Sequence, residues 1–217
     1  MNRAVSVDIW SDIACPWCYI GKRVLDAAVR DFGREVHVTW RSFELAPWSP
    51  TEQEGSYVDT IASRLSITRS STEKLLATIA DRGLDKGLTL NFEAARPGNT
   101  HDAHRLLHLA KVHGRQAEVK ERFCRATFVE GSPMGDRDTL LRLAVEAGLP
   151  EGDVRVVLQS RAFSADVRQD ADEGAKFGVS SVPYFVINGR LRLPGPEDPS
   201  VLVRAFEVAL RSDCPAL

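Results

Sequence analysis

The sequence of 217 residues lacks several features that would assign it to a specialised class of protein. Cysteine occurs only four times, which is too few for a small disulfide-stabilised scaffold. Acidic residues (30) exceed basic residues (28) by only two, and no block of like charges favours nucleic acid or an anionic membrane. No hydrophobic run approaches the length of a transmembrane helix, and no internal repeat is visible. We therefore expect a globular protein with no nucleic-acid partner and no membrane partner.

The first residues, 1–8, run directly into a predicted strand. They lack the long hydrophobic core and the small-residue cleavage site of a secretory signal. We therefore expect a cytoplasmic protein, in which thiols are mostly kept reduced. A disulfide in that compartment is more often transient and catalytic than structural.

Two of the cysteines form a C-x-x-C motif, Cys15-Pro16-Trp17-Cys18, which follows a predicted strand at Val5–Trp10 and precedes a predicted helix. Proline is tolerated at the first helical position because it needs no N–H there, so Cys15 should lie at the N-terminus of that helix. The positive end of the helix dipole stabilises a thiolate, the nucleophilic form of cysteine, and we expect a depressed pKa for Cys15. Cys18 follows one helical turn later, near enough to form a disulfide with Cys15. The motif therefore predicts thiol–disulfide chemistry.

Two other interpretations of the motif exist: half of a structural zinc site, or two buried cysteines that act as small hydrophobic residues. Zinc normally takes four ligands. The remaining cysteines, Cys124 and Cys214, are isolated, and His101, His104 and His108 lie on a separate predicted helix. We expect redox chemistry and no metal site, and the sequence assigns no role to Cys124 or Cys214.

Hydrophobic periodicity divides the chain into three parts. The first has two strands joined by a helix, and the last has a helix, a β-hairpin with Asn188-Gly189 at its turn, and a closing helix. Nearly all of the residues between these two parts show the hydrophobic spacing of helices. The predicted strands are Val5–Trp10, Val36–Phe43, Val182–Ile187 and Arg190–Leu193, with a short extended piece at Leu88–Phe92. The predicted helices are Arg23–Phe32, Tyr57–Leu65, Ser71–Arg82, Thr100–His113, Gln116–Val129, Asp138–Ala147, Asp153–Gln159, Phe163–Phe177 and Pro199–Arg211.

This order of elements predicts an α/β protein with a thioredoxin-like fold interrupted by an all-helical insertion domain. We expect the thioredoxin-like domain to comprise residues 1–48 and 160–217, and the insertion to comprise residues 49–159.

In this topology Val182-Pro183 begins the strand that lies next to the C-x-x-C turn. A proline can simply start a strand, and only about 5–6% of X–Pro bonds in folded proteins are cis. The redox motif and the hairpin nevertheless favour a cis bond that shapes a groove beside the reactive sulfur. The backbone of Val182 would then pair with an extended substrate near Cys15.

The sequence at Cys15–Arg23, CPWCYIGKR, resembles the DsbA-type thiol–disulfide oxidoreductases, most closely their cytoplasmic FrnE-like branch. Further similarities span nearly the whole chain, at Asn99-Thr100, Ala103–Leu106, Phe128–Gly131 and Gly178–Ile187. The resemblance implies a thioredoxin domain with a helical insertion, a nucleophilic Cys15, a resolving Cys18 and a cis-Pro183 beside them.

We expect the substrate to be a protein or small-molecule thiol or disulfide, bound by Pro16, Trp17, Val182 and Pro183. The redox-active disulfide itself replaces a cofactor, and glutathione is a candidate redox partner. Exposed aromatic residues near Trp17 would allow the chain to form a homodimer.

An alternative function is that of a glutathione-dependent isomerase or transferase. The resemblance extends in fold to 2-hydroxychromene-2-carboxylate isomerase and kappa-class glutathione transferase. Those enzymes typically have serine at the position of Cys15 and activate the thiolate of bound glutathione. The presence of both Cys15 and Cys18 favours the oxidoreductase. A chaperone or binding module that uses the groove without turnover is a third class.

Some polar residues near the motif have two interpretations. Asp12 or Asp8 could relay protons to Cys18, although such residues more often cap turns or face solvent. His104 and His108 are expected to be structural, and the resemblance allows them to line a substrate pocket instead.

Overall fold

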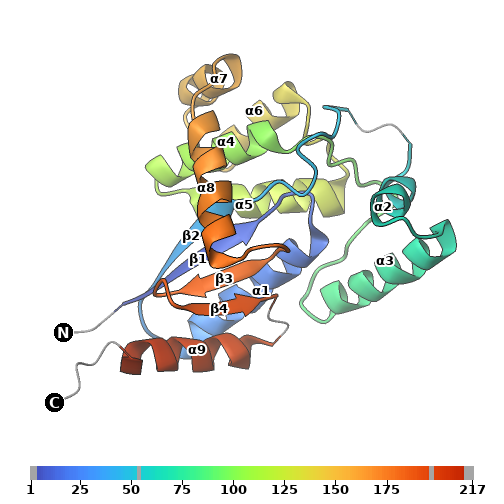
Figure 1. Cartoon of the computed structure of the whole chain (residues 1–217). Coiled ribbons are helices and arrows are strands. Elements are labelled where there is room, and N and C mark those ends of the chain that lie inside the picture. The colour runs from blue at the N-terminus through green and yellow to red at the C-terminus, as the bar shows by residue number, and fades with distance from the viewer. Residues whose placement is uncertain (1–3, 53–54, 196–197, 213–217) are drawn as a thin grey trace.

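The computed structural model describes residues 4–52, 55–195 and 198–212. Within them lies a four-stranded sheet with helices against both faces (Figure 1). Its strands are β1 (Val5–Ser11), β2 (Val36–Ser42), β3 (Tyr184–Ile187) and β4 (Leu191–Pro194). Their order is β2-β1-β3-β4, with β1 parallel to β2 and antiparallel to β3, and β3 antiparallel to β4. The sheet therefore combines the first two strands of the chain with its last two.

The helices fall into two groups. Those packed around the sheet are α1 (Pro16–Phe32), α8 (Ser164–Phe177) and α9 (Pro199–Ser212). Those between β2 and α8 are α2 (Tyr57–Leu65), α3 (Arg69–Leu84), α4 (His101–Val112), α5 (Gln116–Arg125), the π-helix η1 (Ala126–Glu130), α6 (Arg137–Glu146) and α7 (Glu151–Gln159). No helix of the described residues has the length and hydrophobicity needed to cross a bilayer. The predicted α/β class and the helical stretch inside it are both confirmed.

The two faces of the sheet pack against different helices. Val5, Val7 and Ile9 of β1 alternate along the strand and enter a core shared with α1 and α9. Trp10 points to the other face, where its Nε1 donates a 2.7 Å hydrogen bond to the carbonyl oxygen of Asp170 on α8. The alternation thus places α8 across the face of the sheet opposite α1 and α9.

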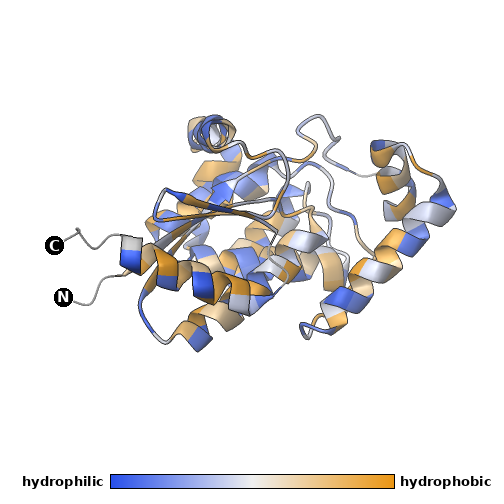
Figure 2. Ribbon diagram, turned by 60° about the horizontal axis from the view of Figure 1, so that its bottom comes forward, coloured by the Kyte–Doolittle hydropathy of each residue, from blue (hydrophilic) through white to orange (hydrophobic). Residues whose placement is uncertain are grey.

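The inserted helices form a second core, which also includes Ile13 and the first turns of α1. Buried residues of α4, α5 and α6 form its centre, including Leu106, Phe123 and Leu140. The α2–α3 pair lies at the end of the molecule far from the start of β1 and the end of α9 (Figures 1 and 2). Figure 2 shows hydrophobic and hydrophilic residues alternating along these helices, as expected for elements with one buried side.

Some element boundaries differ from those predicted. Helix α3 begins at Arg69 rather than Ser71, because the Thr68 side chain accepts a hydrogen bond from the Ser71 N–H and caps the helix. The helix predicted at Gln116–Val129 becomes a π-helix at Ala126.

The segment Leu88–Phe92, predicted as a short extended piece, is neither helix nor strand in the structure. The Leu88 N–H bonds back to the carbonyl of Gly83, and the Asn91 N–H bonds to the carbonyl of Phe128. Each bond joins a single N–H group of the segment to a carbonyl outside any strand, so the segment adds no strand to the sheet.

The third strand begins at Tyr184, two residues later than predicted. Pro183 has no N–H to contribute to the sheet, and the Val182–Pro183 peptide bond is cis, in agreement with the sequence-based expectation. At the hairpin turn, Asn188 (φ 47°) and Gly189 (φ 65°) both have positive φ, as this two-residue turn requires.

Gly21 lets α1 approach Pro183 closely. A Cβ atom at position 21 would lie 2.9 Å from Cγ of Pro183, which is closer than van der Waals contact allows. We expect Gly21→Ala to lower the free energy of unfolding by about 1–2 kcal/mol, because overpacking outweighs the better helix propensity of alanine. Denaturant unfolding measures the change.

Gly152 in α7 is the matched control, since a Cβ there would meet no atom within 4 Å. Gly152→Ala should leave the stability unchanged or raise it. Equal stabilities for the two variants would show that the approach of α1 to Pro183 is not tight.

Candidate thiol–disulfide site

Cys15 is the N-cap residue of α1, as the sequence predicted. Its extended backbone (φ −105°, ψ 112°) leads from β1 into the helix, Pro16 occupies the first helical position, and the Cys15 carbonyl accepts from the Cys18 N–H at 3.0 Å. The Cys15 thiol donates to the carbonyl of Val182 over 3.6 Å. The fold therefore brings the predicted cysteine motif and the Val182-Pro183 segment together.

The two sulfurs differ in their surroundings. Both are free thiols; Cys15 borders a cavity with 5% of its surface exposed, whereas Cys18 lies beneath it with none. A thiol or disulfide arriving from solvent can therefore reach Cys15 before Cys18.

The ionisations of the two thiols are linked because the sulfurs are neighbours. The adjacent Cys18 thiol, together with burial, raises the pKa of Cys15 well above that of a free thiol. Burial also acts to raise the pKa of Cys18, but the adjacent Cys15 thiol, the charge of Lys120 and the hydroxyl of Ser11 outweigh it and lower that pKa. The first ionisation therefore belongs to the pair of thiols, and the surroundings of Cys18 favour its charged form. In the reduced protein, the neighbouring Cys18 thiol and burial oppose the depressed pKa that the sequence predicted for Cys15.

Lys120 is a buried cation that the sequence reading missed. Its side chain on α5 has no exposed surface, lies 5.5 Å from the ring centroid of Trp40, and finds no hydrogen-bond acceptor among the described residues. Its charge favours the Cys18 thiolate. Burial raises the pKa of the neighbouring Cys124 to about 12, so that thiol stays neutral. The sequence did contain a signal for this buried cation, because Lys120 follows the apolar Val119 on the buried side of a predicted helix.

Asp12 fixes the loop after β1. Its Oδ2 accepts from the Leu45 N–H at 2.7 Å, and its Oδ1 accepts from the Ala14 N–H and from His104 Nε2, each at 3.2 Å. Burial opposes ionisation of Asp12, but the hydrogen bond and charge of His104 with the two N–H groups hold its pKa at about 2. Asp12 therefore carries no proton at neutral pH to relay to Cys18, and the interpretation of His104 as a structural residue is supported.

The other polar residues singled out in the sequence form hydrogen bonds or ion pairs with residues away from the two cysteines. His108 Nε2 lies 3.1 Å from Oδ2 of Asp170, and Asp8 pairs with Arg41 at 2.7 Å. Asn99 donates to the carbonyls of Pro47 and Ser49. Cys214 lies outside the described residues. No group of three or more His, Cys, Asp or Glu side chains in the described part of the chain could hold a metal ion.

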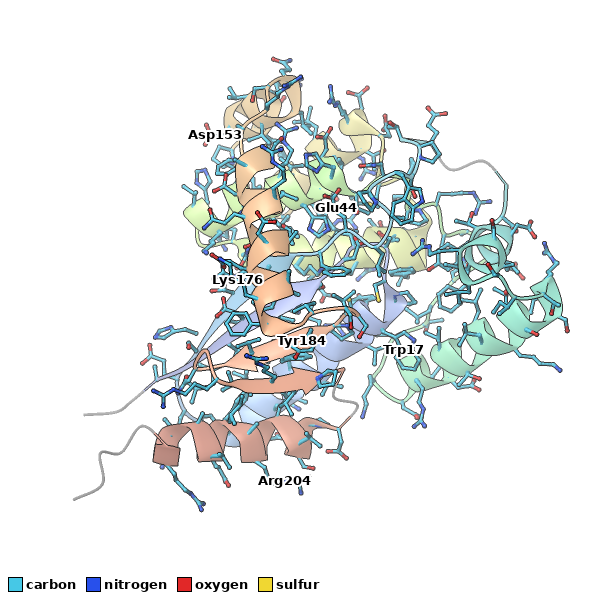
Figure 3. The ribbon with its side chains drawn as sticks, in the orientation of Figure 1. Trp17, Glu44, Asp153, Lys176, Tyr184 and Arg204 are labelled. Carbon is cyan, nitrogen blue, oxygen red and sulfur yellow. The ribbon has the colours of Figure 1, made fainter. Side chains whose placement is uncertain are left out.

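Two cavities flank Trp17, which Figure 3 shows between the end of the sheet and the α2–α3 pair. The larger, of about 300 Å³, is the Cys15 cavity, and the smaller, of about 240 Å³, is the Pro183 cavity. The Cys15 cavity is lined by Ala14, Cys15, Pro16, Trp17, Leu45, Tyr57, Ile61, Arg64, Leu65, Leu75, Leu76, Ile79, Ser180, Ser181 and Val182. The Pro183 cavity is lined by Trp17, Ile20, Gly21, Ser181, Val182, Pro183, Pro194 and Gly195. Every residue predicted to bind substrate lines at least one of them, and a larger cavity of about 520 Å³ lies beyond Arg64.

The chain is similar to known proteins of one family. The family model described as "DSBA-like thioredoxin domain" matches residues 6–207. The Bacillus subtilis protein YwbO is 30% identical over 205 residues, which cover 93% of this chain and 96% of YwbO. The crystal structure of the probable DsbA oxidoreductase SCO1869 from Streptomyces coelicolor has a TM-score of 0.91 at 33% identity, over 98% of this chain and 93% of that one.

Two more distant structures share the fold. The cytosolic disulfide reductase DsbM from Pseudomonas aeruginosa has a TM-score of 0.64 at 21% identity, over 95% of this chain and 99% of its own. A 2-hydroxychromene-2-carboxylate isomerase has a TM-score of 0.70 at 17% identity, over 96% and 97%. The thioredoxin-like fold with a helical insertion is thereby confirmed.

The low pKa of Asp12 gives the folded state a pH dependence. Because that pKa is below the ordinary value of 3.8, the stabilisation is complete above about pH 4 and is lost as the pH falls toward 2. In Asp12→Asn the decrease in the free energy of unfolding between neutral and acid pH should be smaller by about 2 kcal/mol. Denaturant unfolding between neutral and acid pH measures it, with Asp81→Asn, an exposed acid on α3, as the charge control. Parallel profiles for wild type and Asp12→Asn would contradict the assignment.

Removing the charge of Lys120 should raise the pKa of Cys18. In Lys120→Met the first ionisation of the thiol pair should move to higher pH, as followed by the ultraviolet absorbance of the thiolate. Stability at neutral pH should not fall, because a buried methionine avoids the cost of a buried ammonium. Lys111→Met, an exposed residue on α4, controls for net charge. An unshifted titration in Lys120→Met would rule out the interaction.

Proposed function

The chain belongs to the DSBA-like thioredoxin domain family, and on that basis we propose that it is a thiol–disulfide oxidoreductase in which Cys15 is the nucleophile and Cys18 the resolving thiol. One observation carries the assignment of roles. The Cys15 sulfur lies at the N-terminus of α1 and borders a cavity, while Cys18 is fully buried one turn later. Incoming sulfur therefore meets Cys15 first.

The reduced site is arranged for stepwise exchange. When the singly ionised pair carries its proton on Cys18, the nucleophilic thiolate is at Cys15. That thiolate attacks one sulfur of a substrate disulfide, forms a mixed disulfide and releases the other sulfur as a thiolate.

Cys18 then loses its proton and attacks the Cys15 sulfur. This step forms the Cys15–Cys18 disulfide and releases the second substrate thiolate, so that two electrons have passed from protein to substrate. The charge of Lys120 favours the Cys18 thiolate that this step needs. The same steps in reverse oxidise a dithiol.

The substrate is held between α1 and the Val182-Pro183 segment in this proposal. The Val182 carbonyl already accepts from the Cys15 thiol, and it is free to accept from a substrate donor once that proton has left. Pro16, Trp17 and Pro183 line the walls on either side. No cofactor besides the Cys15–Cys18 disulfide enters the reaction, and glutathione is the proposed small-molecule redox partner.

The same residues weigh against the main alternative. A glutathione-dependent isomerase of the structurally similar type would activate the thiolate of glutathione, and it has no need of a buried second cysteine one turn after the first. The placement of Cys18 with Lys120 nearby is understandable only if Cys18 ionises. A cytoplasmic location accords with this proposal, since reduced thiols are the resting state there; the FrnE-like subgroup and a homodimer remain predictions.

Serine substitutions separate the functions. Cys15→Ser should abolish reduction of insulin by dithiothreitol catalysed by the protein, and Cys18→Ser should accumulate a mixed disulfide between Cys15 and substrate that is visible by mass spectrometry. Cys124→Ala, which removes a neutral buried thiol, should retain turnover.

Residual turnover in Cys15→Ser would refute the assigned nucleophile. If that variant kept a glutathione-dependent isomerisation, the isomerase would replace the oxidoreductase as the function. If it retained only the ability to suppress aggregation, a binding module would be favoured.

A further inference from the structure

The Cys15 cavity is apolar almost throughout. Tyr57 and Ile61 on α2, with Leu76 and Ile79 on α3, form the wall opposite the cysteine motif. Its volume of about 300 Å³ is at the lower end of the range for small-molecule sites. A compound with an aromatic ring or a short branched chain would exclude water from these walls when its sulfur reached Cys15.

Among the described residues that line this cavity, Arg64 is the only charged one. It lies on α2, is half-buried, and lines both the Cys15 cavity and the cavity of about 520 Å³ beyond it. Its charge acts on the Tyr57 hydroxyl, which lies 3.4 Å from the carbonyl oxygen of Ala14, next to Cys15. The guanidinium is therefore within a small molecule's length of the reactive sulfur.

Arg64 also differs from other partly buried arginines of the chain. Arg23 pairs with Glu121, Arg41 with Asp8, and Arg122 with two glutamates. The Arg64 side chain forms no ion pair or hydrogen bond within the described residues. A guanidinium withdrawn from water without an anion is unfavourable, and its planar donors match a carboxylate.

We propose that the Cys15 cavity binds a small apolar disulfide or thiol that carries a carboxylate, with Arg64 pairing with the carboxylate while the sulfur meets Cys15. The inference rests on the proposed function and specifies its substrate class. With an aryl disulfide, attack by Cys15 gives the mixed disulfide and one aryl thiolate. Attack by Cys18 gives the second aryl thiolate and the protein disulfide, and the two thiol protons pass to solvent.

Two aryl disulfides test the assignment, because they differ in charge. Dithiobis(nitrobenzoic acid) carries a carboxylate on each ring, and dithiodipyridine carries none. The second-order rate constant for each is measured with fully reduced protein at neutral pH, by the absorbance of the released thiol. Arg64→Gln should slow the reaction with dithiobis(nitrobenzoic acid) by about tenfold, which corresponds to ~1.4 kcal/mol. The reaction with dithiodipyridine should change by less than about twofold, within the range of a surface charge effect.

Two further variants complete the test. Arg64→Lys keeps the charge without the planar pair of donors, so it should lose less than Arg64→Gln. Arg82→Gln, an exposed arginine on α3 outside the lining, should leave both rates unchanged. Equal losses for the two disulfides in Arg64→Gln, or an equal loss in Arg82→Gln, would overturn the proposal.

The outcome is separable from the proposed function. Reaction of dithiodipyridine with wild type, and its loss in Cys15→Ser, test the nucleophile regardless of Arg64. A protein that reduces dithiodipyridine through Cys15 but shows no specific effect of Arg64 would keep its function and lose this substrate class.

Discussion

The site depends on one contact between segments far apart in the chain: the hydrogen bond from the Cys15 thiol to the Val182 carbonyl. The two residues lie in different parts of the chain, since Cys15 follows β1 and Val182 follows α8. They meet because β1 pairs with β3 in a register that sets Trp10 opposite Tyr184, so that the end of one strand lies beside the start of the other. The sheet register thereby determines the distance between the reactive sulfur and the backbone that faces it.

The inserted helices contribute to the site on two sides. Beneath the cysteines, His104 of α4 holds the Asp12 loop and Lys120 of α5 places a positive charge near Cys18. Beside them, α2 and α3 supply the apolar wall of the Cys15 cavity and the charge of Arg64. The thioredoxin-like sheet presents the thiols, and the insertion adds a positive charge near Cys18 and one wall of the cavity in front of Cys15.

Much of the fold could be predicted because it depends on neighbours in sequence. Alternation along β1, helical spacing in α4 and the Asn188-Gly189 turn each reflect residues a few positions apart. Local patterns say less where distant partners decide the outcome. The Asn91 N–H bonds to the carbonyl of Phe128, and the Cys15 thiol bonds to the carbonyl of Val182, and no local pattern reveals either contact.

The sequence by itself determined the cysteine pair and its position at a helix N-terminus, because a strand, a proline and a helical pattern suffice to place two cysteines one turn apart. Only the tertiary structure decided which charges act on the two thiols and what faces the Cys15 sulfur. Those properties arise from Lys120, Val182 and Arg64, which are distant in sequence and meet at the site only after the sheet and the inserted helices have packed. Electrostatic energies depend on distance and burial in the folded chain, and sequence spacing alone specifies neither.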